Sequence, residues 1–190
     1  MTYHTMRTQL VAIFFFVCGS LGAQKYDLFE VDEGQLVWRN IYEYHTHGDS
    51  LKAALEKMLY GTSFIKKVSF NGKEFRGVID NYQIDCKHYG RTFLNTPRIY
   101  WDGKWRGKFI VQMVDNYYRV TVYALHFETK KDPFTYHRNP GPRKGYYSKE
   151  VMLKDKSGFK KTALADMALL SLSLKNNFDW APISPPRLPD

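Results

Sequence analysis

Short turn dipeptides between strand-like runs constrain the fold of this chain more than any other feature. Asn71-Gly72, Asp102-Gly103 and Asp115-Asn116 each follow a run rich in β-branched and aromatic residues. Dipeptides of this kind are typical of tight β-hairpin turns. Hairpins join neighbouring strands that run antiparallel. The strands are expected at residues 36–44, 64–70, 75–84, 99–101, 109–114 and 118–127, with one more at 146–153.

The longest of these runs, 118–127, also predicts which side chains face the core. Successive side chains alternate between the two faces of a strand. Val120, Val122, Ala124 and His126 are expected on one face, and the valines indicate that this face is buried. The opposite face is half apolar and can also be covered. It carries Arg119, Thr121, Tyr123, Leu125 and Phe127.

Two segments have the apolar spacing of amphipathic helices. Asp49 and Ser50 are favoured N-cap residues, and apolar residues recur after them at helical spacing as far as Gly61, a typical helix end. A second helix is expected over 163–175, with Thr162 as its cap, and its mostly apolar surface is typical of a buried helix. Together these elements predict an α+β fold, an antiparallel β-sheet of about five to seven strands with two helices packed on one face.

Residues 1–23 have the pattern of a secretory signal peptide. Arg7 provides the positive start, residues 10–18 are apolar, and mostly small residues precede a cleavage point between Ala23 and Gln24. The apolar run is shorter than the ~20 residues that a membrane-spanning helix needs. No transmembrane segment is therefore expected after signal removal. The protein is expected to be exported, to the periplasm, to the cell surface or into the medium.

The remaining chain is expected to form one domain, 24–180, followed by a flexible tail, 181–190, that contains four prolines. Hydrophobic residues make up 44% of the 190-residue chain, which suits a packed core and excludes a disordered chain. Cys86 is the one cysteine left after signal removal, so it cannot form an internal disulfide. It is expected to be a small buried hydrophobic residue.

Positive charge is concentrated in one segment of the chain. Residues 130–161 hold ten Lys or Arg against three Asp or Glu, whereas the whole chain holds 28 against 19. Five Phe or Tyr are interleaved with these cations, and such a mixture can bind a polyanion by charge and stacking. A solvated loop would have the same composition. The candidate polyanion-binding residues are Lys130, Lys131, Tyr136, Arg138, Arg143, Lys144, Tyr146 and Lys149.

The sequence contains no recognised motif of a catalytic or cofactor site. His45 and His47 would share one face of a continuing strand and are weak candidates for a metal site, although a polar strand end explains them equally simply. Trp101 and Trp105 flank a turn and fit either an exposed aromatic edge or a cross-strand pair. No catalytic residue, metal or cofactor is expected.

Several stretches of the chain are similar to a known protein family. They are Gln35–Trp38, the helix from Ser50, Phe75–Ile79, Val114–Thr121, Thr162–Met167 and Asn177–Trp180. On these residues the chain resembles a family of exported Bacteroidetes proteins that carry a domain of unknown function with a TBP-like fold. The similarity spans nearly all of residues 24–180. It implies the α+β fold and export, and it assigns no site residue because the family has no established activity.

The expected function is that of an exported, non-enzymatic domain that binds an anionic polymer or another protein of the cell envelope through segment 130–161. No specific nucleic-acid partner is expected. Two other classes stay open. A hydrolytic enzyme with an unrecognised site would have a cleft with two or more strongly shifted pKa values. An assembly protein would offer a long, uncharged edge strand for pairing with another chain.

Overall fold

The computed structural model describes residues 25–44, 49–114, 117–129, 144–147, 152–154 and 158–180. The helices are α2 (Asp49–Gly61), α3 (Arg98–Trp101) and α5 (Lys161–Phe178). The strands are β1 (Lys25–Tyr26), β2 (Phe29–Asp32), β3 (Gln35–Glu43), β4 (Ile65–Phe70), β5 (Glu74–Tyr82), β6 (Lys104–Val114), β7 (Tyr117–Thr129), β8 (Lys144–Tyr147), β9 (Leu153–Lys154) and β10 (Gly158–Phe159).

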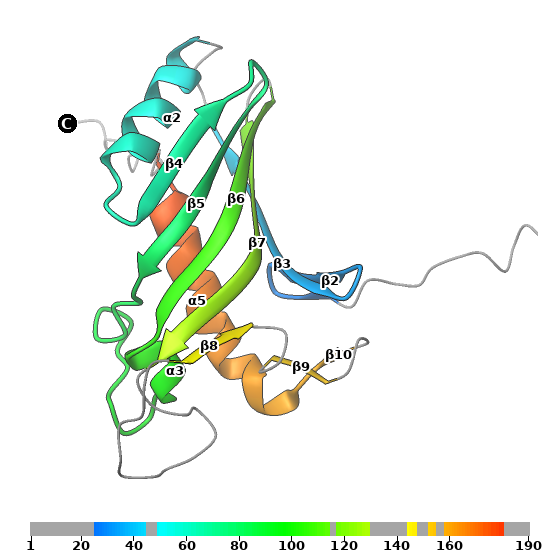
Figure 1. Ribbon diagram of the computed structural model, residues 1–190, viewed down its shortest axis with the longest axis vertical. Coiled ribbons are helices and arrows are strands. Elements are labelled where there is room, and N and C mark those ends of the chain that lie inside the picture. Colours follow the sequence, from blue (N-terminus) through cyan, green and yellow to red (C-terminus); the bar gives the residue numbers. More distant parts are fainter. Residues whose placement is uncertain are drawn as a thin grey trace, which may run out of the picture.

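Eight of the strands form one antiparallel sheet. Its order is β1-β2-β3-β7-β6-β5-β4, and β8 pairs with the last residues of β7, beyond the part that β3 pairs with. β9 and β10 form a separate two-stranded sheet. The two long helices cover one face of the large sheet, with α5 visible behind its strands (Figure 1). The expected α+β fold is confirmed, and the short strands β1 and β8 bring the sheet to eight strands.

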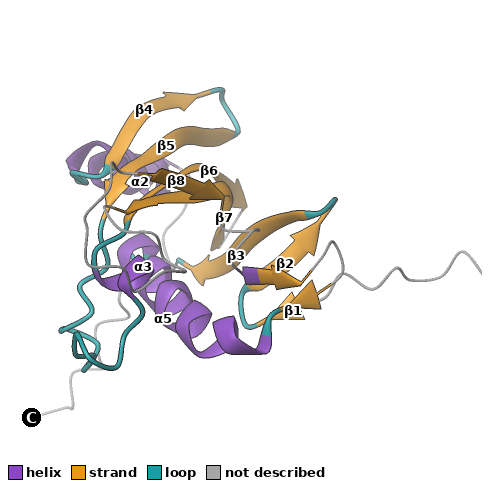
Figure 2. Cartoon of the chain, turned by 60° about the horizontal axis from the view of Figure 1, so that its bottom comes forward, coloured by secondary structure: helices purple, strands orange, loops and turns teal. Residues whose placement is uncertain are grey.

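The core fills the space between this sheet and the two long helices (Figure 2). On α2, Leu51, Leu55 and Leu59 are buried at the four-residue spacing of one helix face. α5 is buried along much of its length, as its apolar sequence predicts. The sheet side of the core is largely aromatic, and its fully buried rings include Trp38, Phe75, Phe109 and Tyr118.

Polar side chains of the sheet form hydrogen bonds with α5 at several positions along the helix. Trp38 Nε1 donates a hydrogen bond to Ser171 Oγ at 3.2 Å. Near the end of the helix, Tyr42 OH donates to the carbonyl oxygen of Lys175 at 2.9 Å, and Tyr118 OH donates to a further carbonyl at 2.7 Å, that of residue 178. The last carbonyls of a helix have no partner within it. The two tyrosines therefore cap the end of α5 from the sheet.

The predicted faces of β7 are correct only for its first half. Val120 and Val122 are fully buried, as expected. In the second half the buried side chains are Leu125 and Phe127, so the expectation that these two face away from the core is wrong. The expected inward position of His126 is wrong for the same reason, and its side chain is half-buried on the other face.

A β-bulge at Ala124 causes this change of face. Its φ is 52°, and the register between β6 and β7 shifts between Arg106 and Lys108. A bulge places two residues of one strand opposite one residue of its neighbour. All later side chains of β7 are therefore moved to the opposite face.

The predicted strand at 99–101 and the hairpin turn after it are both wrong. The residues form the short helix α3, whose first turn is closed by hydrogen bonds to the carbonyl oxygen of Pro97. The backbone then passes very close to itself, because a Cβ on Gly103 would lie 1.9 Å from the carbonyl oxygen of Ile99. Gly103 is thus required for a close backbone approach and not for a hairpin turn.

The two tryptophans beside this segment have different surroundings. Trp105 is fully buried, and its ring centroid lies 5.2 Å from that of Phe127, its cross-strand neighbour. Trp101 is half-buried on α3. The expectation of an exposed aromatic edge is therefore wrong for Trp105. The expected aromatic pair across the Asp102-Gly103 turn is also wrong, because Trp101 lies on α3, and Trp105 instead faces Phe127 of β7 across the strands.

The hairpin at Asn71-Gly72 is confirmed. Oδ1 of Asn71 accepts hydrogen bonds from the backbone N–H groups of Lys73 and Glu74, each at 3.0 Å. Gly72 has a φ of 91°. The turn is therefore closed by an asparagine side chain and a glycine with positive φ, as in many short loops.

The helix expected between Asp49 and Gly61 is confirmed as α2, but Asp49 and Ser50 lie inside its first turn and Gly61 is its last residue, so none of the three is a cap outside the helix. The second helix, α5, is longer than expected at both ends, and its N-cap residue is Lys160, so Thr162 lies inside the first turn and is not the cap. Of the strand expected at residues 146–153, the described parts belong to β8 and to the start of β9.

The expected signal peptide and tail, 1–23 and 181–190, lie outside the described residues. Within the part of the chain that is described, no helix is long and apolar enough to cross a membrane.

Candidate functional site

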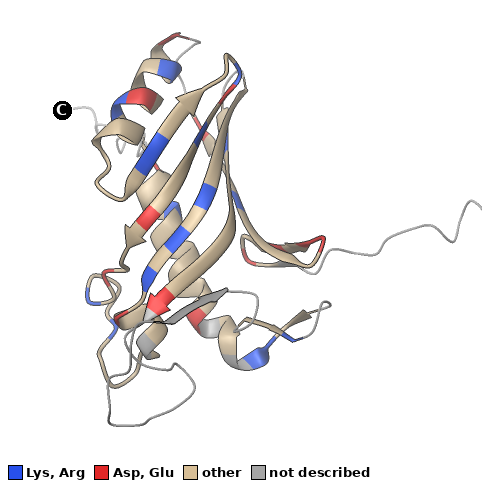
Figure 3. Ribbon diagram, in the orientation of Figure 1, with Lys and Arg blue, Asp and Glu red and all other residues tan. Residues whose placement is uncertain are grey.

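The face of the sheet away from α2 and α5 presents rows of side chains that cross several strands. In one row Lys66 of β4 is paired with Val78 of β5, Val78 with Lys108 of β6, and Lys108 with Tyr123 of β7. Both lysines are exposed, and Val78 and Tyr123 are half-buried. We call these four residues the central row. Figure 3 shows the bands of Lys and Arg that cross β4, β5 and β6.

Arginines on this face form ion pairs with neighbouring carboxylates. Arg106 contacts Asp80 at 2.9 Å through Nε and Glu128 at 2.7 Å through Nη1. Arg76 contacts Glu74 at 2.5 Å, and this hydrogen bond is the main reason why the pKa of Glu74 lies below its usual value. These carboxylates are thus already neutralised by neighbouring arginines.

A third arginine also forms ion pairs with carboxylates, on the other side of the sheet. Arg39 of β3 forms ion pairs with Glu30 and with Asp32 of β2, the latter at 3.1 Å. The acidic residues of the β2–β3 hairpin therefore pair within their own hairpin. They do not neutralise the cations of β4 and β6.

Several cations of the outward face have no such partner. Lys66, Lys108 and Arg119 have no carboxylate within 4.0 Å among the described residues. Arg119 lies on β7 opposite Gln112 of β6 and Ile41 of β3. The outward face therefore has a positively charged centre, flanked by ion pairs.

The predicted polyanion-binding residues are only partly within the described chain. Lys144 and Tyr146 lie on β8, where the backbone of residue 144 pairs with Thr129 and that of residue 146 with Phe127. The other candidates lie outside the described residues: Lys130, Lys131, Tyr136, Arg138, Arg143 and Lys149. β8 thus joins the basic segment to the large sheet.

The weak metal-site candidates, His45 and His47, also lie outside the described residues. Among the residues that are described, no group of three or more His, Cys, Asp or Glu side chains is arranged to hold a metal ion.

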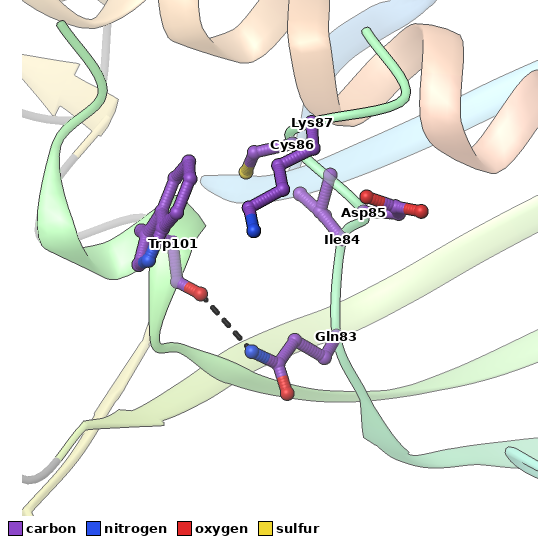
Figure 4. Close-up of a pocket in the computed structure, with 6 residues that line it drawn as sticks. All are labelled: Gln83, Ile84, Asp85, Cys86, Lys87 and Trp101. Atoms are coloured by element: carbon purple, nitrogen blue, oxygen red, sulfur yellow. Dashed lines mark hydrogen bonds between the residues drawn. The ribbon is translucent and has the colours of Figure 1, made fainter. Parts of the chain in front are cut away.

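A cleft of about 450 Å³ lies between α3 and the chain segment after β5 (Figure 4). Gln83 spans its floor: Nε2 donates to the carbonyl oxygen of Trp101 at 3.1 Å, and Oε1 accepts from Lys104 Nζ at 2.8 Å. The side chain of Lys87 points into the cleft, and Asp85 points away from it. The volume would admit a small molecule.

Cys86 lies against this cleft but is not poised for chemistry. Its side chain is 4% exposed, and Sγ donates to the carbonyl oxygen of Tyr100 at 3.2 Å. Burial raises the pKa of the Cys86 thiol. Reactive cysteines need the opposite shift. The expectation of a small buried side chain is therefore confirmed.

A second, smaller cleft of about 300 Å³ adjoins the first and ends at α5. Tyr82 OH is hydrogen-bonded to Ser173 Oγ and accepts from Asn177 Nδ2 at 2.9 Å. Burial raises the pKa of Tyr82, which keeps the phenol neutral. Each cleft thus has one residue with a clearly raised pKa, and neither has the pair of oppositely tuned groups that acid–base catalysis uses.

The free edge of the sheet at β4 is short and irregular. β4 has six residues, and Lys67 has a φ of 52° where the register with β5 shifts. Lys66 is next to this bulge. Charges and bulges are features that prevent an edge strand from pairing with another chain. β4 is therefore unlike the long, uncharged edge that an assembly protein would use.

The central row could not be identified from the sequence. Each of its residues comes from a different strand, and the hydrophobic pattern places Lys66 or Lys108 on an outward face without specifying its neighbours. Only the strand order and register bring them together.

No family model and no curated protein matches this chain. Two solved structures do. A TBP-like protein from Parabacteroides distasonis has 15% identity and a TM-score of 0.46, over 77% of this chain and 90% of that one. A DUF4468 family protein from Bacteroides ovatus has 13% identity and a TM-score of 0.43, over 82% and 84%. The structural neighbours of the chain are thus a TBP-like protein and a DUF4468 family protein, both from Bacteroidetes, as the sequence resemblance led us to expect.

Proposed function

We propose that this protein is an exported, non-enzymatic domain that binds an anionic polymer of the cell envelope through its basic segment at 130–161. The observation that carries the proposal is the pairing of β8 with β7. Residues 144–147 of this basic segment are paired with β7 in the large sheet, so ligand binding there would lose less conformational entropy than binding to a free chain.

The described surface also supports an anionic ligand. β8 pairs with the end of β7, and the second half of β7 also pairs with the part of β6 that holds Lys104, Arg106 and Lys108. Positive charge on adjacent parts of one sheet attracts a polyanion more strongly than the same charge dispersed over a surface. The described clefts do not have two strongly shifted groups in one place, so the enzyme alternative has less support.

Retention on immobilised heparin, a sulfated polysaccharide, tests the proposal. The full chain should be retained at low salt, and elution should require added salt. The variant Arg143→Glu/Lys144→Glu should elute at lower salt. Lys57→Glu/Lys175→Glu, which makes the same charge change on the helices, is the matched control.

Equal elution of the two variants would contradict a specific role of segment 130–161. Absence of any retention at low salt would refute anionic-polymer binding itself. Capture of an envelope protein by both the wild type and the Arg143 variant would point to the protein partner instead. Export has its own test, because the mass of the exported chain should correspond to a start near Gln24.

A further inference from the structure

We infer that the outward face of β4–β7 is the surface along which a linear anionic polysaccharide binds, with the central row at its centre. The inference rests on the proposed function, since it names the class of polymer and adds a second part to the site. It uses residues that the structure describes, and none of them belongs to segment 130–161.

Charge is the first argument. Lys66 and Lys108 are exposed and lie two strand spacings apart, about 10 Å, on either side of Val78. Arg119 adds a third cation further along β7. Because these three have no carboxylate partner among the described residues, a ligand can pair with them without breaking an internal ion pair. The neighbouring acids Asp80 and Glu74 are already paired with arginines and repel an anion less than free carboxylates would.

Shape is the second argument. The outward side chains of four paired strands form a continuous surface, and α2 and α5 lie on the opposite face. Between the cations this surface has half-buried apolar residues, Val78 and Ile110, and one half-buried ring, Tyr123. The apolar faces of sugar rings can pack on such residues while the acidic groups contact the lysines. An extended polymer with a negative charge about every 10 Å would match the lysine spacing.

The same surface suits a nucleic acid less well. Sequence-tolerant binding of single strands relies on several aromatic rings on which successive bases stack. Among the described outward positions of β4–β7 the rings are Tyr117, Tyr123 and His126, and all of them lie on one strand. The cations, in contrast, extend over three strands. Charge pairing rather than base stacking is therefore the main contribution this face can make.

The experiment compares two double variants with the same loss of charge. Lys66→Gln/Lys108→Gln removes two cations from the outward face. Lys57→Gln/Lys175→Gln removes two exposed cations from α2 and α5, on the covered side. Binding of a heparin oligosaccharide to the full chain is measured by calorimetry at several salt concentrations, with a 20-base-pair DNA duplex as the competing polyanion. Circular dichroism checks that each variant is folded.

Lys66→Gln/Lys108→Gln should raise the dissociation constant for heparin about 2- to 30-fold, the range expected for two exposed ion pairs. It should also weaken the salt dependence, and Lys57→Gln/Lys175→Gln should change little. Equal effects of the two variants, with normal wild-type binding, would overturn this inference and leave the proposed function standing. If Lys66→Gln/Lys108→Gln weakens binding and Arg143→Glu/Lys144→Glu does not, the proposed role of segment 130–161 is overturned and the inference about the outward face stands. Tighter binding of DNA than of heparin would overturn the assignment to a polysaccharide.

Discussion

Leu125 is the position at which the β-bulge of β7 makes the sharpest prediction. A regular strand would point this side chain away from the core, whereas the bulge at Ala124 turns it inward, where it is 4% exposed. It packs over Gly107, since a Cβ on that glycine would lie 3.1 Å from Leu125 Cδ2. Leu125→Ala should therefore create a cavity and destabilise the fold by about 2–5 kcal/mol.

Urea denaturation, monitored by circular dichroism, measures this loss of folding free energy. For a domain of this size the melting temperature should fall by about 2–4 °C for each kcal/mol, or about 4–20 °C in all. The control is Thr121→Ala, which lies on the outward face before the bulge and should cost less than about 1 kcal/mol. A loss at Leu125 no larger than at Thr121 would refute the bulge and restore the regular alternation.

Val120→Asp should unfold the domain, because an unpaired charge would replace a fully buried side chain; a folded, soluble variant on gel filtration and circular dichroism would contradict the core assignment. Tyr118→Phe should cost about 1–3 kcal/mol in urea denaturation, since the carbonyl oxygen of Phe178 would lose its donor at 2.7 Å, and an unchanged midpoint would contradict that capping role. Thiol labelling of Cys86 should be much slower in the folded than in the unfolded chain at pH 8, and equal rates would show that the thiol is accessible. Burial raises the pKa of Cys86, so the unfolded chain releases the thiol proton first and stability should fall as the pH rises above the usual thiol pKa; Cys86→Ala should remove that part of the decline.

The predicted elements differ in how well local sequence specifies them. The helix α2 was predicted, because its apolar spacing and its terminal glycine lie within one segment, although the two expected cap residues are part of its first turn. The segment 99–101 was not, because three aliphatic and aromatic residues fit a strand or a buried helical turn equally well. Its conformation is set by Pro97 and by the close approach at Gly103, both of which need the surrounding backbone.

The candidate site also has one part that is evident in the local sequence and another that depends on the tertiary structure. The density of Lys and Arg in residues 130–161 is evident in the sequence, but no count of charges indicates which strand such a segment pairs with. The central row was not predictable, because each of its members is an unremarkable surface residue of its own strand. Its charge becomes significant only when Lys66 and Lys108 are placed on either side of Val78.

The sequence by itself determined the α+β class, the antiparallel pairing and the apolar face of one long helix. These properties depend on hydrophobic period and turn chemistry, which act over a few residues. Tertiary structure alone decided the strand order, the bulge at Ala124 and the neighbours of each outward side chain. Those depend on contacts between residues far apart in the chain, and a single extra residue in one strand is enough to exchange its buried and exposed faces.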